Sequence, residues 1–143
     1  MGLLLGLLIG ACQFGGYYGP PRPGIHFRAS LPEASAQFSF ADRFATELAK
    51  RSGFKIVGAD QSSNENEVLA ARNIDLRLDT DKLIYVTIGV YTKKKLFFVT
   101  IEGPDSSSPT ALSLSKNAQD IYVEWFPGEH LETFNSHQGI FWP

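Results

Sequence analysis

Cysteine is nearly absent from this sequence, since the 143 residues contain one, Cys12. A single cysteine excludes an intramolecular disulfide and a zinc site built from several thiolates. An excess of either charge is also missing, because the formal net charge is −2. That balance gives no electrostatic support for a nucleic-acid partner. We therefore expect no nucleic acid, no metal and no cofactor.

A hydrophobic run long enough to cross a bilayer is missing as well. Residues 1–11 are apolar and uncharged, but as a helix they would span about 17 Å, against a hydrocarbon core of about 30 Å. Three interpretations remain for this run: the hydrophobic region of a signal peptide, a buried helix, or an interfacial anchor.

The residues around the single cysteine favour the first interpretation. An aliphatic residue and two small residues precede it, in the order Leu8-Ile9-Gly10-Ala11-Cys12. This segment resembles the lipobox of bacterial lipoproteins. The resemblance implies that residues 1–11 are a signal peptide, that Cys12 carries diacylglycerol, and that its new amino terminus is acylated after cleavage. It also implies, through Gln13 in place of Asp, an outer-membrane location facing the periplasm.

The amino-terminal side departs from a standard signal peptide. A signal peptide opens with positive charge, whereas no Lys or Arg precedes Arg22. Either the true start lies upstream, or the basic region is degenerate.

A tether is expected between the lipidated cysteine and the folded domain. Seven of the twelve residues from 13 to 24 are Gly or Pro, a composition that forms extended spacers. Residues 12–37 are accordingly predicted to be the tether, and residues 38–143 a single small domain. Ile25, Phe27 and Leu31 leave open a short edge strand within the tether.

One amphipathic helix is predicted at Ser39–Arg51. Apolar residues recur there at helical spacing, Ser39 is in position to cap the first turn, and Gly53 can end the helix.

The rest of the domain is rich in strand-forming residues. Alternating or β-branched segments predict strands at 54–57, 74–78, 83–91, 96–102 and 121–126. Residues 110–118 fit either a short helix or a strand. Short connections favour antiparallel pairing. The expected fold class is α+β, with one amphipathic helix packed on a four- to five-stranded, mainly antiparallel sheet.

Patterns with catalytic or metal-binding chemistry are weak. Ser113 and Lys116 fit Ser-x-x-Lys, but its companion elements Ser-Asp-Asn and Lys-Thr-Gly are missing. Histidines and acids at Glu129, His130, Glu132 and His137 match no standard metal-ligand spacing. We therefore expect neither catalytic residues nor a metal site, and no enzyme.

The last residues are a candidate for partner binding. Phe141 and Trp142 are large apolar side chains beside the final proline. Such residues either dock on their own domain or serve as anchors for a partner.

These observations lead to a functional expectation. The chain is predicted to be a lipid-anchored, non-catalytic module that binds an envelope protein or supports an envelope assembly. The alternative is a periplasmic immunity lipoprotein that neutralises a toxin, and a small hydrolase has less support.

Overall fold

A computed structural model describes residues 24–134, apart from 69 and 81. Its elements, in chain order, are β1 (Gly24–Ser30), the 3-10 turn η1 (Glu33–Ser35), α2 (Phe38–Ser52), β2 (Lys55–Gln61), β3 (Ala71–Arg77), β4 (Tyr85–Tyr91), β5 (Leu96–Glu102), α3 (Pro109–Trp125) and β6 (Glu132–Thr133). No helix in these ranges has both the length and the apolar character that crossing a membrane requires.

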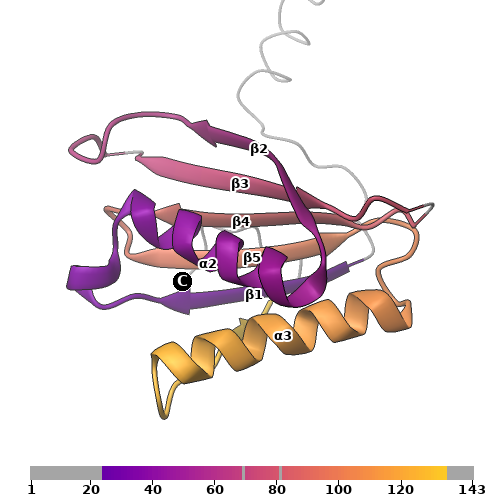
Figure 1. Ribbon diagram of the computed structural model, residues 1–143. Coiled ribbons are helices and arrows are strands. Elements are labelled where there is room, and N and C mark those ends of the chain that lie inside the picture. The colour runs from indigo at the N-terminus through magenta and orange to yellow at the C-terminus, as the bar shows by residue number, and fades with distance from the viewer. Residues whose placement is uncertain (1–23, 69, 81, 135–143) are drawn as a thin grey trace, which may run out of the picture.

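The strands form one sheet that both helices cover from the same side. The strand order is β2-β3-β4-β5-β1-β6, and every pairing is antiparallel. Figure 1 shows α2 and α3 in front of the sheet, with α2 across its middle and α3 beside β1. The predicted α+β class is confirmed, since the described part of the chain has six strands where four or five were expected and two α-helices where one was expected.

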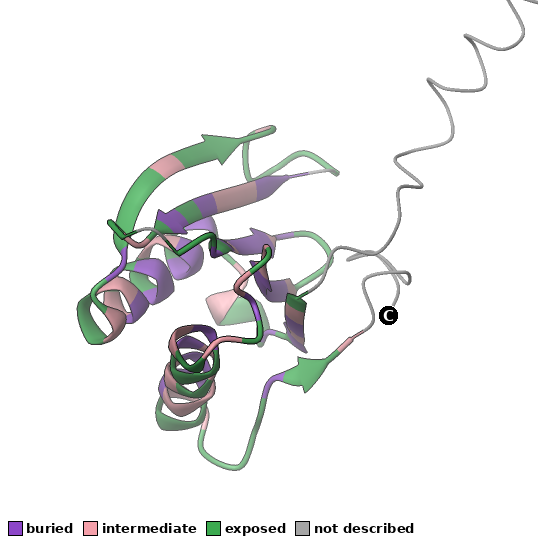
Figure 2. Cartoon of the chain, turned by 90° about the vertical axis from the view of Figure 1, so that its right-hand side faces the viewer, coloured by how far each residue is buried: buried purple, intermediate pink, exposed green. Residues whose placement is uncertain are grey.

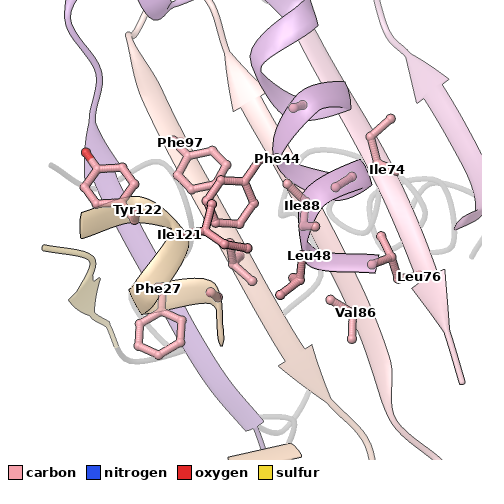
Figure 3. Close-up of a cluster of buried hydrophobic side chains, with 14 of the residues drawn as sticks. Phe27, Phe44, Leu48, Ile74, Leu76, Val86, Ile88, Phe97, Ile121 and Tyr122 are labelled. Atoms are coloured by element: carbon pink, nitrogen blue, oxygen red, sulfur yellow. The ribbon is translucent and has the colours of Figure 1, made fainter. Parts of the chain in front are cut away.

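The core lies between the helices and the sheet. Its central aromatic contacts join Phe44 of α2 to Phe97 of β5, with ring centroids 4.7 Å apart, and Phe97 to Tyr122 of α3 at 6.1 Å. Ile88 on β4 is fully buried beneath them. Figure 3 shows these side chains converging from the sheet and from both helices. Each such side chain contributes about 1.5–3 kcal/mol when it leaves water.

Helix α2 begins differently from the prediction, although its position is confirmed. The residue that precedes its first turn is Gln37, not Ser39, and no side chain at that position caps the helix. Instead, the backbone N–H of Phe38 donates to Oε1 of Glu65, 3.0 Å away in the loop after β2. A carboxylate at the positive end of a helix is favourable. The helix ends as predicted at Gly53, whose φ of 77° needs a glycine.

The predicted domain boundary at Phe38 lies too far along the chain. β1 pairs with β5 along its whole length, from Gly24 opposite Glu102 to Ser30 opposite Leu96. It is also not an edge strand, because β6 pairs with its other side. The folded domain therefore includes residues 24–37, which the prediction assigned to the tether.

The predicted final strand at 121–126 is wrong, because most of that segment belongs to α3. Ser108 accepts a hydrogen bond from the N–H of Ala111, and Pro109 occupies the first turn, both typical of a helix start. The buried residues then recur at helical spacing, namely Ala111, Leu114, Ala118, Ile121 and Tyr122. The apolar and aromatic residues after 120 resemble a strand only when this preceding periodicity is ignored.

Candidate functional site

Three residues singled out by the sequence lie outside the described residues. They are the lipidation candidate Cys12 and the partner-binding candidates Phe141 and Trp142. Their roles remain predictions.

The Ser113 and Lys116 pair is not brought together. Ser113 lines a groove of about 360 Å³ between the end of α2 and the start of α3. The ammonium of Lys116 instead pairs with Asp120 at 2.7 Å, and Lys116 is not among the groove residues. The groove's one cationic side chain, Arg51, binds Glu47 and Glu124, and its hydrogen bonds lower the pKa of Glu124. Ser113 therefore has no general base among the groove residues.

Glu129 and His130 are exposed between α3 and β6, and Glu132 is exposed at the start of β6. Within residues 24–134, leaving out 69 and 81, no group of three His, Cys, Asp or Glu side chains is placed to hold a metal ion. His137, which the sequence analysis considered with these residues, lies outside that range.

A different site is found on the face of the sheet opposite α2 and α3, here called the distal face. The strand register brings its side chains into rows, because residues directly opposite each other point to the same side. In one row, Asp75 faces Thr87, Thr87 faces Thr100, and Thr100 faces His26. In the next row, Tyr85 faces Glu102.

The two rows enclose a hollow of about 340 Å³, here called the distal hollow. Its lining residues are Asp75, Arg77, Tyr85, Val86, Thr87 and Glu102. They come from β3, β4 and β5, each of which pairs with a neighbouring strand on both sides. A site built on such strands keeps its side chains in a fixed arrangement.

Arg77 and Tyr85 form the most specific contact in the distal hollow. The guanidinium carbon of Arg77 lies 3.8 Å from the centre of the Tyr85 ring, well inside the range of a cation–π interaction. No carboxylate in the described part of the chain forms an ion pair with Arg77. Arg72, near the other end of β3, is by contrast bound through two nitrogens to Asp42. Arg77 is therefore oriented by stacking while its N–H donors are available.

The acidic residues of the distal hollow have identified neighbours. Oδ1 of Asp75 accepts a hydrogen bond from the Thr87 hydroxyl at 2.9 Å. The carboxylate of Glu102 lies 3.9 Å from Nδ1 of His26. Asp79, just after the end of β3, pairs with Lys55 of β2 at 3.1 Å, and both side chains are exposed.

The distal face beyond the hollow is more apolar. Phe98 is buried and its ring lies 5.8 Å from that of Tyr91. Burial raises the pKa of the Tyr91 hydroxyl above its ordinary value, and the negative charge of Asp60 adds to the rise. Gly89 lies between these residues and Asn73, opposite both Asn73 and Phe98.

Gly89→Ala is expected to destabilise the domain by about 1–3 kcal/mol, because its new methyl group would overlap the Phe98 ring and the Asn73 side chain. Urea unfolding measures the change. Gly58→Ala is the matched control, since a Cβ there makes only ordinary contacts, 3.7 Å from Asp75 Oδ2. Equal stabilities for the two variants would contradict the tight packing described for Gly89.

The sequence alone did not identify Tyr85, Thr87 and Glu102 as neighbours of Arg77. Asp75 and Arg77 alternate with apolar residues in the sequence, as on any solvated strand face, and Tyr85 is one of the aromatic residues in the β-rich segments. Only the register of β3, β4 and β5 brings them together.

Comparison with known proteins gives no further information about this site. No protein-family model matches the sequence, and no curated protein is similar enough to match it.

Proposed function

We propose that this chain is a non-catalytic lipoprotein of the bacterial envelope, lipid-anchored at Cys12 and facing the periplasm, that binds another protein with its distal hollow. The anchor part rests on the lipobox-like residues Leu8 to Cys12 and on the absence of any other cysteine in the chain. The binding part rests on the described domain.

The observation that carries the binding proposal is the Arg77–Tyr85 stack. Arg and Tyr are enriched among the residues that dominate binding energy at protein interfaces. Here they lie together in a hollow that Asp75 and Glu102 also line, so a partner would find hydrogen-bond acceptors beside the stacked arginine. Leu83, two residues before Tyr85, is half exposed. A pre-oriented arginine costs less conformational entropy when a partner binds it than a freely moving one does.

The hydrolase interpretation has less support. A hydrolytic site needs a nucleophile within hydrogen-bond reach of a base, and Lys116 pairs with Asp120 instead of Ser113. The distal hollow holds carboxylates, but their arrangement with a threonine, a tyrosine and an arginine favours recognition over bond cleavage.

Photo-crosslinking in cells that make the full chain tests the binding proposal. Replacing Tyr85 with p-benzoylphenylalanine retains an aromatic ring in the hollow, and the same residue at exposed Leu112 on α3 serves as the control position. We expect a discrete protein adduct from position 85 that Arg77→Ala reduces severalfold, and no such adduct from position 112. Identical adducts from both positions would contradict the proposal. So would an adduct from position 85 whose yield is unchanged by Arg77→Ala. The identity of the adduct then separates an envelope-assembly partner from a toxin.

A further inference from the structure

Strand β2 ends the described sheet and pairs only with β3. Among residues 24–134, except 69 and 81, no strand occupies its other side. Six of its seven residues are exposed, and the exposed fractions of Ile56 and Val57 are 48% and 58%. Figure 2 shows this strand almost wholly exposed, in contrast to the strands beneath the helices. An edge with unpaired backbone groups and apolar side chains can add a strand from another chain.

A bulge in β2 determines which side chains share a face. The register passes from Ile56 opposite Leu76 to Gly58 opposite Asp75, so Val57 is an extra residue. Because opposite residues share a face, Ile56 and Ala59 point to the helix side with Leu76 and Ile74.

The distal side of β2 carries both of its charges. Lys55 lies opposite Arg77, and Asp60 lies opposite Asn73, so both side chains point to the same face as the distal hollow. Without the bulge, residues 55 and 60 would point to opposite faces, since their separation in the sequence is odd.

We infer that β2 pairs antiparallel with β2 of a second copy of this chain, about a two-fold axis at Gly58. A two-fold axis normal to the sheet places the helix side of one copy beside the helix side of the other, and the distal face beside the distal face. Two residues can therefore lie opposite each other only if both point to the same face. Gly58 then lies opposite its own copy. Because Val57 is again the extra residue, Ile56 lies opposite Ala59 of the second copy, which points to the same face. Lys55 then lies opposite Asp60 of the second copy, and the symmetry repeats both pairs.

This register is complementary in charge and in polarity. Opposite charges at directly opposed positions of a β-pair are favourable, whereas like charges are not. Charged residues on an edge strand commonly prevent self-pairing by repulsion, but Lys55 and Asp60 attract each other when the strand meets its own copy. The existing ion pair of Lys55 with Asp79 joins two exposed side chains, so exchanging it costs little. This inference concerns the β2 edge of the sheet, not the distal hollow, and it does not depend on the proposed function.

Cysteine crosslinking tests the register in the full chain carrying Cys12→Ala. Gly58→Cys then supplies the sole cysteine, at a position with room for a Cβ. In an antiparallel pair, opposite Cα atoms lie about 4.5–5.5 Å apart, within the range that a disulfide bridges. We expect mild oxidation to give a disulfide-linked dimer on a non-reducing gel.

Two single-cysteine controls accompany Gly58→Cys in the same background. Ala59→Cys tests the register, because its own copy would lie more than about 7 Å away, beyond disulfide reach. Val68→Cys tests nonspecific collision, since Val68 is exposed in the loop after β2. Dimer yields at 58 that do not exceed those at 59 and 68 would overturn the inference.

Exchanging the charges of Lys55 and Asp60 supplies a second test. Its expected result is a recovery of the dimer yield in the double variant, which unfolding would not produce. In the Gly58→Cys background, Lys55→Asp should lower the dimer yield severalfold, because it places Asp opposite Asp60. Adding Asp60→Lys should restore the yield, since the opposite charges face each other again. A double variant that stays at the level of Lys55→Asp would contradict the proposed pairing.

Discussion

Replacing Phe44 with alanine is expected to lower the free energy of unfolding by about 3–5 kcal/mol. Phe44 is fully buried in α2, and its ring contacts Phe97 at 4.7 Å and Trp125 at 5.6 Å between centroids. It therefore joins the helix to the centre of the sheet and to the end of α3. Truncation would remove these contacts and leave a cavity, because α2, β5 and α3 cannot all move inward to fill the space.

Chemical denaturation of the Phe44→Ala variant measures this loss. The matched control is Leu112→Ala, a comparable truncation on α3 at a side chain that is 55% exposed, for which a change within about 0.5 kcal/mol is expected. A typical domain has only about 5–15 kcal/mol of stability, so Phe44→Ala should bring the protein close to unfolding. Similar losses for the two variants would mean that Phe44 does not occupy the centre of the core.

Replacing Cys12 with alanine is expected to abolish lipid labelling and to release the protein from membranes. The sulfur of Cys12 is the only thiol in the chain, and the resemblance to a lipobox makes it the site of the diacylglycerol. Each buried methylene group contributes about 0.8 kcal/mol to anchoring, and two acyl chains already hold a protein stably. Loss of the thiol should therefore remove the anchor completely.

Incorporation of radiolabelled palmitate and fractionation of cell envelopes measure the two effects. Gln13→Ala is the neighbouring control and should retain the label, because it leaves the cysteine and the residues before it unchanged. An unlabelled wild-type chain, or membrane association that persists unchanged in Cys12→Ala, would refute the lipoprotein proposal.

Local patterns in the sequence identified the elements whose signals are contained within one segment. The apolar spacing of Phe40, Phe44 and Leu48 predicted α2, and these residues are buried as expected. Likewise, the β-rich segments 83–91 and 96–102 and the short connection between them predicted antiparallel strands, and β4 pairs with β5 in this way. In these segments, hydrophobic periodicity and intrinsic propensity agree with the tertiary environment.

The errors arose where a distant residue controls the local structure. Ser39 satisfied the local rule for a helix cap, but Glu65 from another loop binds the first amide of α2. Residues 24–30 looked like a continuation of a Gly/Pro-rich tether, yet β5 supplies their pairing partner from about seventy residues further along. Neither partner is visible in a short window of sequence.

The sequence by itself determined the α+β class, the position of α2, the antiparallel pairing of β4 with β5 and the expectation of a lipidated Cys12, because each depends on residues close together in the chain. The tertiary structure decided the start of the domain, the helical state of α3 and the composition of the distal hollow. Arg77 stacks on Tyr85 and lines one hollow with Glu102 only because the registers of three strands align them. The bulge at Val57 alone brings Lys55 and Asp60 to one face. Strand register depends on hydrogen bonds and packing between segments far apart in the chain, so local propensity does not specify it.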